Sequence, residues 1–314
     1  MSVAGRIFGS PPEPVFNLEG ACMPAELLED QLFILASQNE EYAQCNTIYD
    51  QGYFCSGILA QYIFLVCEKF RLPSESQFLA VDIFDKFMSR HLHGLYKYIR
   101  TSNKYADKKE EWKALENKLS RLMCLRMVSS VQIASKLISH AKVVTIRKCN
   151  NFLSQSGRNY TNESIMLSEL SILKALDFKV SSTSALTYIE ALLEILGHND
   201  TMTNVKVLHD TCLHILEMTY IQRQSVYEKL CCIATGNAEV CHEERVKFRT
   251  VEQDMMLLSV AIIGAATYVT EQKMLDRVLD NLGKITRIPM EDIVDFSTIL
   301  VEEALQSNCN ILNF

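Results

Sequence analysis

The stretch from Arg121 to Ile138 constrains this chain most strongly, because it contains neither proline nor glycine. Its apolar residues surround the helical circumference instead of forming one stripe: Leu122, Leu125, Val128, Val131, Ile133, Leu137 and Ile138. This distribution predicts a helix with neighbours on most sides. Four small residues would let other helices approach its backbone closely: Ser129, Ser130, Ala134 and Ser135.

Lys136 is the charged residue in the second half of this helix, and two interpretations of it stay open. An unpaired buried ammonium is costly, so the side chain must reach a surface or be paired. Either its stem packs along the core with the charge in water, or its charge contacts a partner protein.

The composition favours a packed, all-helical protein. With 314 residues, the chain has room for one large or two ordinary domains. Hydrophobic residues make up 48% and charged residues 22%, whereas glycine and proline number only 11 and 6. The formal charge of −7 argues against a molecule that binds nucleic acid with its whole surface.

The cysteines and titratable residues do not suggest catalysis, a metal or a cofactor. The 11 cysteines form no C-x-x-C motif and indicate a reducing, intracellular compartment. The nearest approach to a metal cluster lacks the spacing of a structural zinc site: Cys231, Cys232, Cys241 and His242. No recognisable nucleophile–base set or glycine-rich phosphate loop occurs, so we expect no enzyme, no catalytic residue and no cofactor.

The chain divides into four parts by pattern. Residues 1–23 resemble a mobile arm, with Ser10 before a proline as a candidate phosphorylation site. Residues 24–180 predict a first helical domain, in which a charged insertion at about 89–120 breaks the helical pattern. Residues 184–306 predict a second helical domain, with helices at about 184–197, 203–233, 251–270, 272–287 and 289–306. The run from Met255 to Val269 is too short and too interrupted to span a bilayer, so we expect a core helix and no membrane partner. No signal peptide is expected.

Three segments in order resemble the cyclin box. LPSESQFLAVDIFDKFMSRHL is similar to its second helix, and Glu75, Leu79 and Asp85 are among the matching residues. IASKLI resembles the A-S-K signature of its central helix, and YTNESIMLSELSILKALDFKV resembles its last helix without a gap. The resemblance covers about residues 54–180 and implies a five-helix bundle around Arg121–Ile138. The expected fold is therefore all-α, with tandem cyclin-like helical bundles.

The resemblance also implies a partner-binding surface. In cyclins, a central-helix lysine and an acid of the last helix hydrogen-bond the kinase beside an apolar surface. Lys136 and Glu169 match these two positions, and the apolar surface maps to Leu137, Leu173 and Phe178. A lysine donates and a carboxylate accepts, so the pair can orient a partner's backbone. This implication favours partner contact for Lys136.

Departures from the family pattern weaken one other cyclin feature. The patch that docks kinase substrates is degenerate here, and consists of Cys55, Ile58, Leu59 and Tyr62. The internal arginine and aspartate beside that patch are replaced by Ser56 and Gln61, which avoids an unpaired charge. Trp112 in the insertion is a second candidate for partner binding, because an exposed tryptophan is a strong anchor.

A divergent box with an insertion resembles the cyclin-N-terminal-domain-containing proteins, which include cyclin-like meiotic crossover factors. That resemblance implies a non-catalytic adaptor in crossover maturation during homologous recombination, nuclear and associated with chromosomes. The alternative is a conventional cyclin that binds and activates a cyclin-dependent kinase. A third possibility, tandem cyclin folds acting on DNA, is disfavoured by the acidic balance. We therefore expect protein partners and no direct nucleic acid.

Overall fold

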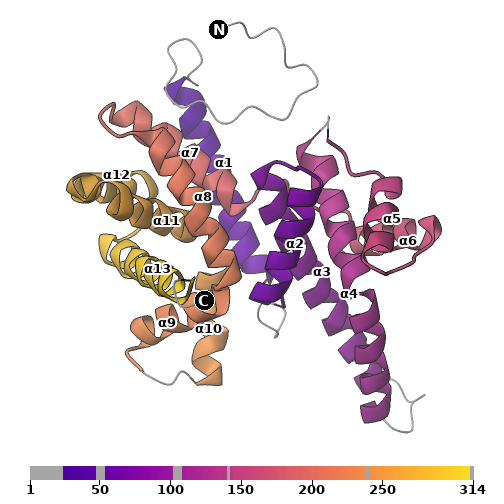
Figure 1. Ribbon diagram of the computed structural model, residues 1–314. Helices are drawn as coiled ribbons and strands as arrows, with labels where there is room; N and C mark the ends of the chain where they lie inside the picture. The colour runs from indigo at the N-terminus through magenta and orange to yellow at the C-terminus, as the bar shows by residue number, and fades with distance from the viewer. Residues whose placement is uncertain (1–23, 47–53, 102–107, 140–141, 238–240, 312–314) are drawn as a thin grey trace, which may run out of the picture. The chain divides into compact units, whose positions relative to one another are not determined.

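The computed structural model describes residues 24–46, 54–101, 108–139, 142–237 and 241–311, and within these ranges it is helical with no β-strand (Figure 1). The predicted all-α class is thereby confirmed. Contacts divide the chain into two units. The first unit contains α2 to α6, and the second contains α1 together with α7 to α13.

The first unit is a five-helix bundle in which α4 contacts each of the other four helices. Its helices are α2 (Gly57–Lys69), α3 (Ser74–Thr101), α4 (Lys108–Ile138), α5 (Ile146–Gln155) and α6 (Asn162–Ala175). The side chains of Thr145 and Thr161 cap the first turns of α5 and α6 by accepting backbone N–H groups. The stretch Arg121–Ile138 thus forms the centre of the bundle, as its apolar distribution predicted.

Small serines explain how neighbouring helices approach α4 so closely. The Ser129 hydroxyl donates to the Ser168 hydroxyl of α6 at 2.8 Å, and both residues are buried. The buried Ser135 hydroxyl accepts the backbone N–H of Val144 at 3.0 Å and donates to the Gln132 carbonyl. Hydrogen bonding offsets the cost of burying these hydroxyl groups, so α4 can be polar and central at once.

The expected break in helical pattern at 89–120 is wrong for the residues that the structure describes. Residues 89–101 continue α3, and residues 108–120 form the first part of α4. The two helices pack along each other, so the insertion extends two core helices into a helical pair (Figure 1). Dense charge hid this continuity, because a helix that projects beyond its bundle needs no wide apolar face.

The second unit is also arranged around one buried helix. Its helices are α1 (Ala25–Asn46), α7 (Ala185–Asn199), α8 (Val205–Ile221), α9 (Arg223–Thr235), α10 (His242–Glu252), α11 (Met255–Thr270), α12 (Leu275–Thr286) and α13 (Met290–Ile311), with a short 3-10 helix at Gln272–Met274. α11 contacts α1, α7, α8, α12 and α13. It is buried from Met255 to Thr267 except at Leu257, as predicted for a core helix, and only its last turn is exposed.

The structure places α1 in the second unit, whereas the sequence interpretation grouped residues 24–180 in one domain. The Asn39 side chain donates to Asp254 at 2.9 Å and accepts the backbone N–H of Met255 at 2.8 Å. The Tyr188 hydroxyl donates to the carbonyl of Leu35. These bonds join residues more than 150 positions apart, which local sequence patterns cannot reveal. The predicted arm at 1–23, including Ser10, lies outside the described residues.

Two helices predicted in the second half are each split in two. The pattern over 203–233 is α8 and α9, which meet at Gln222 without a proline or glycine. The pattern over 251–270 begins in α10 and restarts at Asp254, whose side chain caps α11.

Within the described residues, no single helix is long and apolar enough to cross a membrane. The segments Glu243–Glu252 and Met255–Thr270 meet that length and composition only as a pair bent by 72°.

Candidate partner-binding surface

The structure brings Lys136 and Glu169 together on the surface of the first unit. Lys136 lies in the last turn of α4, and its ammonium donates to a carboxylate oxygen of Glu169 on α6. The lysine side chain is 42% exposed and the glutamate side chain 15% exposed. The Lys136 ammonium is therefore both paired with Glu169 and accessible to solvent, so no unpaired charge is buried here.

The packing of α4 on α6 holds this pair in place. The Arg126 guanidinium donates to the Ser168 carbonyl at 3.0 Å and to the Ser168 hydroxyl at 3.1 Å. Since Ser168 precedes Glu169 in the chain, these bonds fix the position of the backbone that carries the carboxylate. Charged donors give the stronger class of hydrogen bond, so the register of α6 on α4 is well defined here.

Exposed apolar side chains surround the ion pair. Leu137 is exposed beside Lys136, Phe178 is 63% exposed after the end of α6, and Leu173 is half-buried. The sequence interpretation missed three more exposed apolar residues of α6: Met166, Leu167 and Leu170. The signal was present, because α6 carries more apolar residues than one buried stripe requires. Leu167 is two positions from Glu169 and therefore lies on the other side of α6. Together with Lys136 and Glu169, the other five apolar residues are called the pair surface below.

The backbone after α6 holds Phe178 outward in an unusual conformation. Asp177 and Phe178 both have positive φ, at 53° and 57°, although neither is glycine. The N–H of Phe178 donates to the Leu173 carbonyl at 2.8 Å, and Asp177 pairs with Arg90 at 3.8 Å. Left-handed conformations of non-glycine residues cost about 1–2 kcal/mol each. A strained turn that presents a large apolar ring to solvent is consistent with a binding role.

The four residues of the degenerate docking patch do not form an open apolar surface. Ile58 is 79% exposed, but Cys55 is buried and both Leu59 and Tyr62 are half-buried. Burial and the neighbouring Cys124 raise the pKa of Tyr62 to about 12, which keeps its hydroxyl protonated. The backbone N–H groups of residues 54 and 55 donate to Asp85, which fixes the start of α2.

Trp112 is not the exposed anchor that the sequence suggested. It is half-buried in α4 and packs edge-on against Tyr96 of α3, with ring centroids 5.9 Å apart. The exposed aromatic side chains of this helical pair are instead Tyr96 and Tyr98. Trp112 therefore joins α3 to α4.

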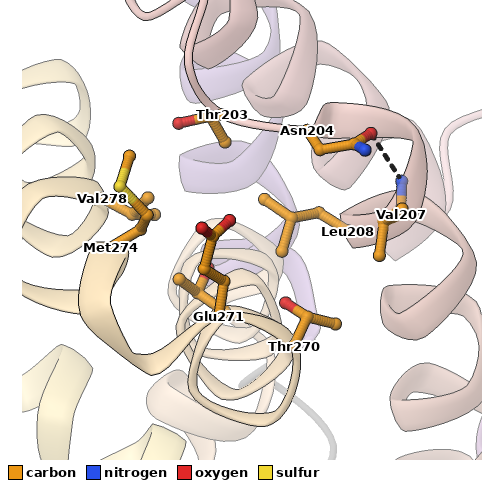
Figure 2. Close-up of a pocket in the computed structure, with 9 residues that line it drawn as sticks. Thr203, Asn204, Val207, Leu208, Thr270, Glu271, Met274 and Val278 are labelled. Atoms are coloured by element: carbon orange, nitrogen blue, oxygen red, sulfur yellow. Dashed lines mark hydrogen bonds between the residues drawn. The ribbon is translucent and has the colours of Figure 1, made fainter.

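A cavity in the second unit is too small for a cofactor. It measures about 110 Å³ and is lined by Thr203, Asn204, Val207, Leu208, Thr267, Thr270, Glu271, Met274 and Val278. Figure 2 shows the Glu271 carboxylate directed into this space. Small-molecule sites usually measure about 300–1,000 Å³, so this cavity suits a few waters or one side chain.

No group of three or more His, Cys, Asp or Glu residues within the described ranges is placed to hold a metal ion. Burial raises the pKa of the Cys149 thiol, near the pair surface, to about 12. Such a thiol is protonated and unreactive at neutral pH.

A helical bundle built around α4, with this lysine–glutamate pair beside exposed apolar residues, has the form of a cyclin box. The family profile described as "Cyclin, N-terminal domain" matches residues 33–181. Cyclin N-terminal domain-containing protein 1 of Mus musculus is 32% identical over 284 residues, covering 90% of this chain and 85% of the relative. The Homo sapiens protein of the same name is 32% identical over 286 residues, covering 90% and 86%. The putative cyclin-A3-1 of Arabidopsis thaliana is 25% identical over 170 residues, covering 54% of this chain and 39% of the relative. The chain belongs to the family of cyclin N-terminal domain-containing protein 1.

Proposed function

We propose that this protein is a non-catalytic regulatory adaptor that binds a protein partner through the pair surface. By resemblance to cyclin-like crossover factors, it acts in the maturation of meiotic crossovers, in the nucleus and on chromosomes. The observation that carries the binding role is the Lys136–Glu169 pair surrounded by exposed apolar side chains.

The chemistry of this surface suits a protein partner. An ammonium has three donors and a carboxylate has two acceptor oxygens, so the pair keeps free capacity after bonding internally. Burial of exposed apolar side chains such as Met166, Leu137 and Phe178 against a partner is favourable, because it removes them from water. The ion pair then orients the partner, and the apolar residues supply most of the affinity.

Kinase activation is the second candidate function, and the same pair favours it. In conventional cyclins, these two positions contact the kinase. The buried Cys55 and half-buried Tyr62 count against it, because a closed docking patch cannot recruit kinase substrates. Recombinant protein should therefore bind Arg-x-Leu docking peptides weakly or not at all, and should not stimulate common cyclin-dependent kinases when added alone.

A charge-swap series tests the binding role separately from stability. Lys136→Glu and Glu169→Lys should each abolish recovery of the protein's partners from meiotic tissue. The double variant, Lys136→Glu with Glu169→Lys, restores the internal ion pair but presents reversed charges. It should recover the melting temperature without recovering the partners.

Lys118→Glu on the exposed part of α4 is the matched control, since it makes the same charge change away from the pair surface. Partner recovery equal to that of the unaltered protein for every swap variant would remove the binding role.

A tagged Lys136→Glu protein should also lose its foci on meiotic chromosomes and fail to restore crossovers in a null background. Normal foci and crossovers would overturn the adaptor proposal, and robust kinase stimulation would favour the second candidate.

A further inference from the structure

The first unit is strongly basic, although the whole chain is acidic. Residues 51–182 contain 20 lysines and arginines against 11 aspartates and glutamates. From Asn117 to Asn162 there is no acidic residue, and this stretch carries 8 lysines and arginines. Overall composition conceals the imbalance, because residues 183–314 contain 10 basic and 19 acidic residues.

The tertiary structure gathers part of this charge where the end of α2 meets α5 and the segment just before α5. The Lys142 ammonium donates to the Arg71 carbonyl at 3.0 Å, and the rings of Phe70 and Phe152 lie 5.5 Å apart. We call the resulting cluster the basic corner, which consists of Lys69, Arg71, Lys142 and Lys148. Three of these residues are exposed, and Lys142 is half-buried.

Backbone groups, and no carboxylate among the described residues, hold the basic corner together. Lys142 bonds the Arg71 carbonyl, and Lys148 bonds the Val143 carbonyl at 3.4 Å. Glu68 is exposed on the same turn of α2 and forms no ion pair within the described ranges. Each ammonium still has two N–H donors available, so the cluster can accept an anion without breaking these bonds.

Two positions in the basic corner carry a basic residue where another residue type is usual. Lys148 lies in the first turn of α5, which has no acidic residue, whereas the helix dipole favours acids at that end. Arg71 adopts a positive φ of 54° after α2, a position that glycine usually occupies. A bound anion would relieve the repulsion between these side chains.

The basic corner borders the pair surface. Lys148 lies on α5, which packs against both α4 and α6, the helices that carry Lys136 and Glu169. A partner that covers the pair surface therefore has a short path along the surface to the basic corner.

We propose that the basic corner binds an acidic segment of the protein partner that covers the pair surface. This inference rests on the proposed function. A protein suits this position better than nucleic acid, because exposed Leu137 and Phe178 lie on the adjoining surface and a phosphate backbone gains nothing from apolar contact. The basic residues of the α3–α4 extension are interleaved with Glu110, Glu111 and Glu116, so the positive charge does not continue as a track for DNA.

Fluorescence anisotropy with the full-length protein tests the proposal. The probe is a fluorescein-labelled peptide of six alternating Glu-Ala repeats, measured at low salt. The double variant Lys142→Glu, Lys148→Glu should bind it at least about tenfold more weakly. The control Lys113→Glu, Lys118→Glu has the same net charge and alters exposed lysines of the α3–α4 extension. It should change the affinity by less than about twofold.

A neutral variant and a DNA probe complete the test. Lys142→Gln, Lys148→Gln should weaken peptide binding to an intermediate degree while keeping the melting temperature, which excludes misfolding as the cause. Equal weakening in the corner and control variants, or no binding by the unaltered protein, would overturn the proposal. Tighter binding of a duplex DNA of equal charge, lost in the corner variant alone, would overturn it in favour of nucleic acid.

The same probe separates this inference from the proposed function. Lys136→Glu should leave the peptide affinity within about twofold, because the peptide needs only the basic corner. If Lys136→Glu retains the cellular partners while the corner variant loses the peptide, the pair surface fails and the basic corner stands. If Lys136→Glu loses the partners and the corner variant binds the peptide normally, the basic corner fails and the pair surface stands.

Discussion

The two units each contain a lysine–glutamate pair that joins two helices, and the surroundings of these pairs differ. In the first unit, Lys136 and Glu169 lie among exposed apolar side chains. In the second unit, Lys229 donates to Glu303 at 2.7 Å, and the buried Glu303 carboxylate also accepts the Ser225 hydroxyl at 2.7 Å. The first pair is open to a partner, whereas the second closes the contact between α9 and α13.

The comparison shows that an ion pair alone does not identify a binding site. Solvent-exposed pairs contribute little to stability, so an exposed pair beside apolar residues is available for function. A buried carboxylate needs its partners to offset desolvation, so the Glu303 pair belongs to the fold. Net charge follows the same division, since residues 51–182 are basic and residues 183–314 are acidic.

The largest expected effect comes from charging the two central helices. Ala134 of α4 and Ala265 of α11 are both fully buried. Replacing either by arginine combines overpacking with burial of a charge, and should cost about 3–5 kcal/mol. Hydrogen exchange should show lost protection in residues 57–175 for Ala134→Arg and in residues 185–306 for Ala265→Arg. Unchanged protection in either variant would contradict the central position of that helix.

The next prediction compares the two pairs directly. Glu303→Ala should lower the free energy of unfolding by about 2 kcal/mol, because it removes two charge-assisted hydrogen bonds from a buried site. Glu169→Ala should lower it by less than about 1 kcal/mol. Urea unfolding of both variants provides the measurement. Equal losses would remove the distinction between a pair for binding and a pair for folding.

The α3–α4 extension provides a smaller effect within the first unit. Trp112→Ala removes the edge-on contact with Tyr96 and should cost about 1–2 kcal/mol, after allowance for its half-exposed position. Tyr98→Ala, at an exposed position on the same extension, should stay within about 0.5 kcal/mol. If the extension contacts a partner, Tyr98→Ala should reduce partner recovery although its melting temperature is normal. Normal recovery, together with normal recovery after deletion of residues 94–118, would exclude the extension from binding.

The smallest expected effect is a difference between the two units in how the free energy of unfolding changes with pH. Burial, with help from Arg126, lowers the pKa of His91 below its usual 6.5, while its ring stacks on Phe87 at 5.1 Å. Because the unfolded chain then binds a proton more readily than the folded one, stability is full above about pH 6.5 and falls below it. The loss is at most about 1.4 kcal/mol per pH unit.

The pKa of Glu303 in the second unit is also lowered, but this group responds at lower pH and for a different reason. Burial opposes ionisation of its carboxyl, but the bonds from Lys229 and Ser225 outweigh it and lower the pKa below 4.5. Its stabilising contribution is therefore present above about pH 4.5 and is lost as the pH falls through the lowered pKa.

The measurement for His91 is urea unfolding at pH 7.0 and 5.5. Between these two pH values, the free energy of unfolding should fall less for His91→Phe than for the unaltered protein. An identical loss in both would show that His91 does not control this step.

Sequence patterns predicted the helical class and the central helix, and the resemblance to the cyclin box placed Lys136 and Glu169 on one surface. These predictions depend on local periodicity and on short motifs, which the chain carries in recognisable but divergent form between Glu75 and Phe178. The patterns did not predict that α3 and α4 each extend into the charged insertion, over residues 89–101 and 108–120. They also did not predict the two breaks at Gln222 and Asp254, since only tertiary contacts distinguish a long helix from two short ones.

By itself, the sequence determined which residues are apolar, charged or small, and therefore which segments become helices and which helix of the first unit is central. Only the tertiary structure decided that α1 packs with the second unit, through Asn39 and Tyr188. It likewise decided that Trp112 is covered by Tyr96, that four apolar side chains of the pair surface remain exposed, and that Lys142 reaches Arg71. The physical reason is that periodicity reports the faces of one helix, whereas exposure and charge clustering depend on segments far apart in the chain.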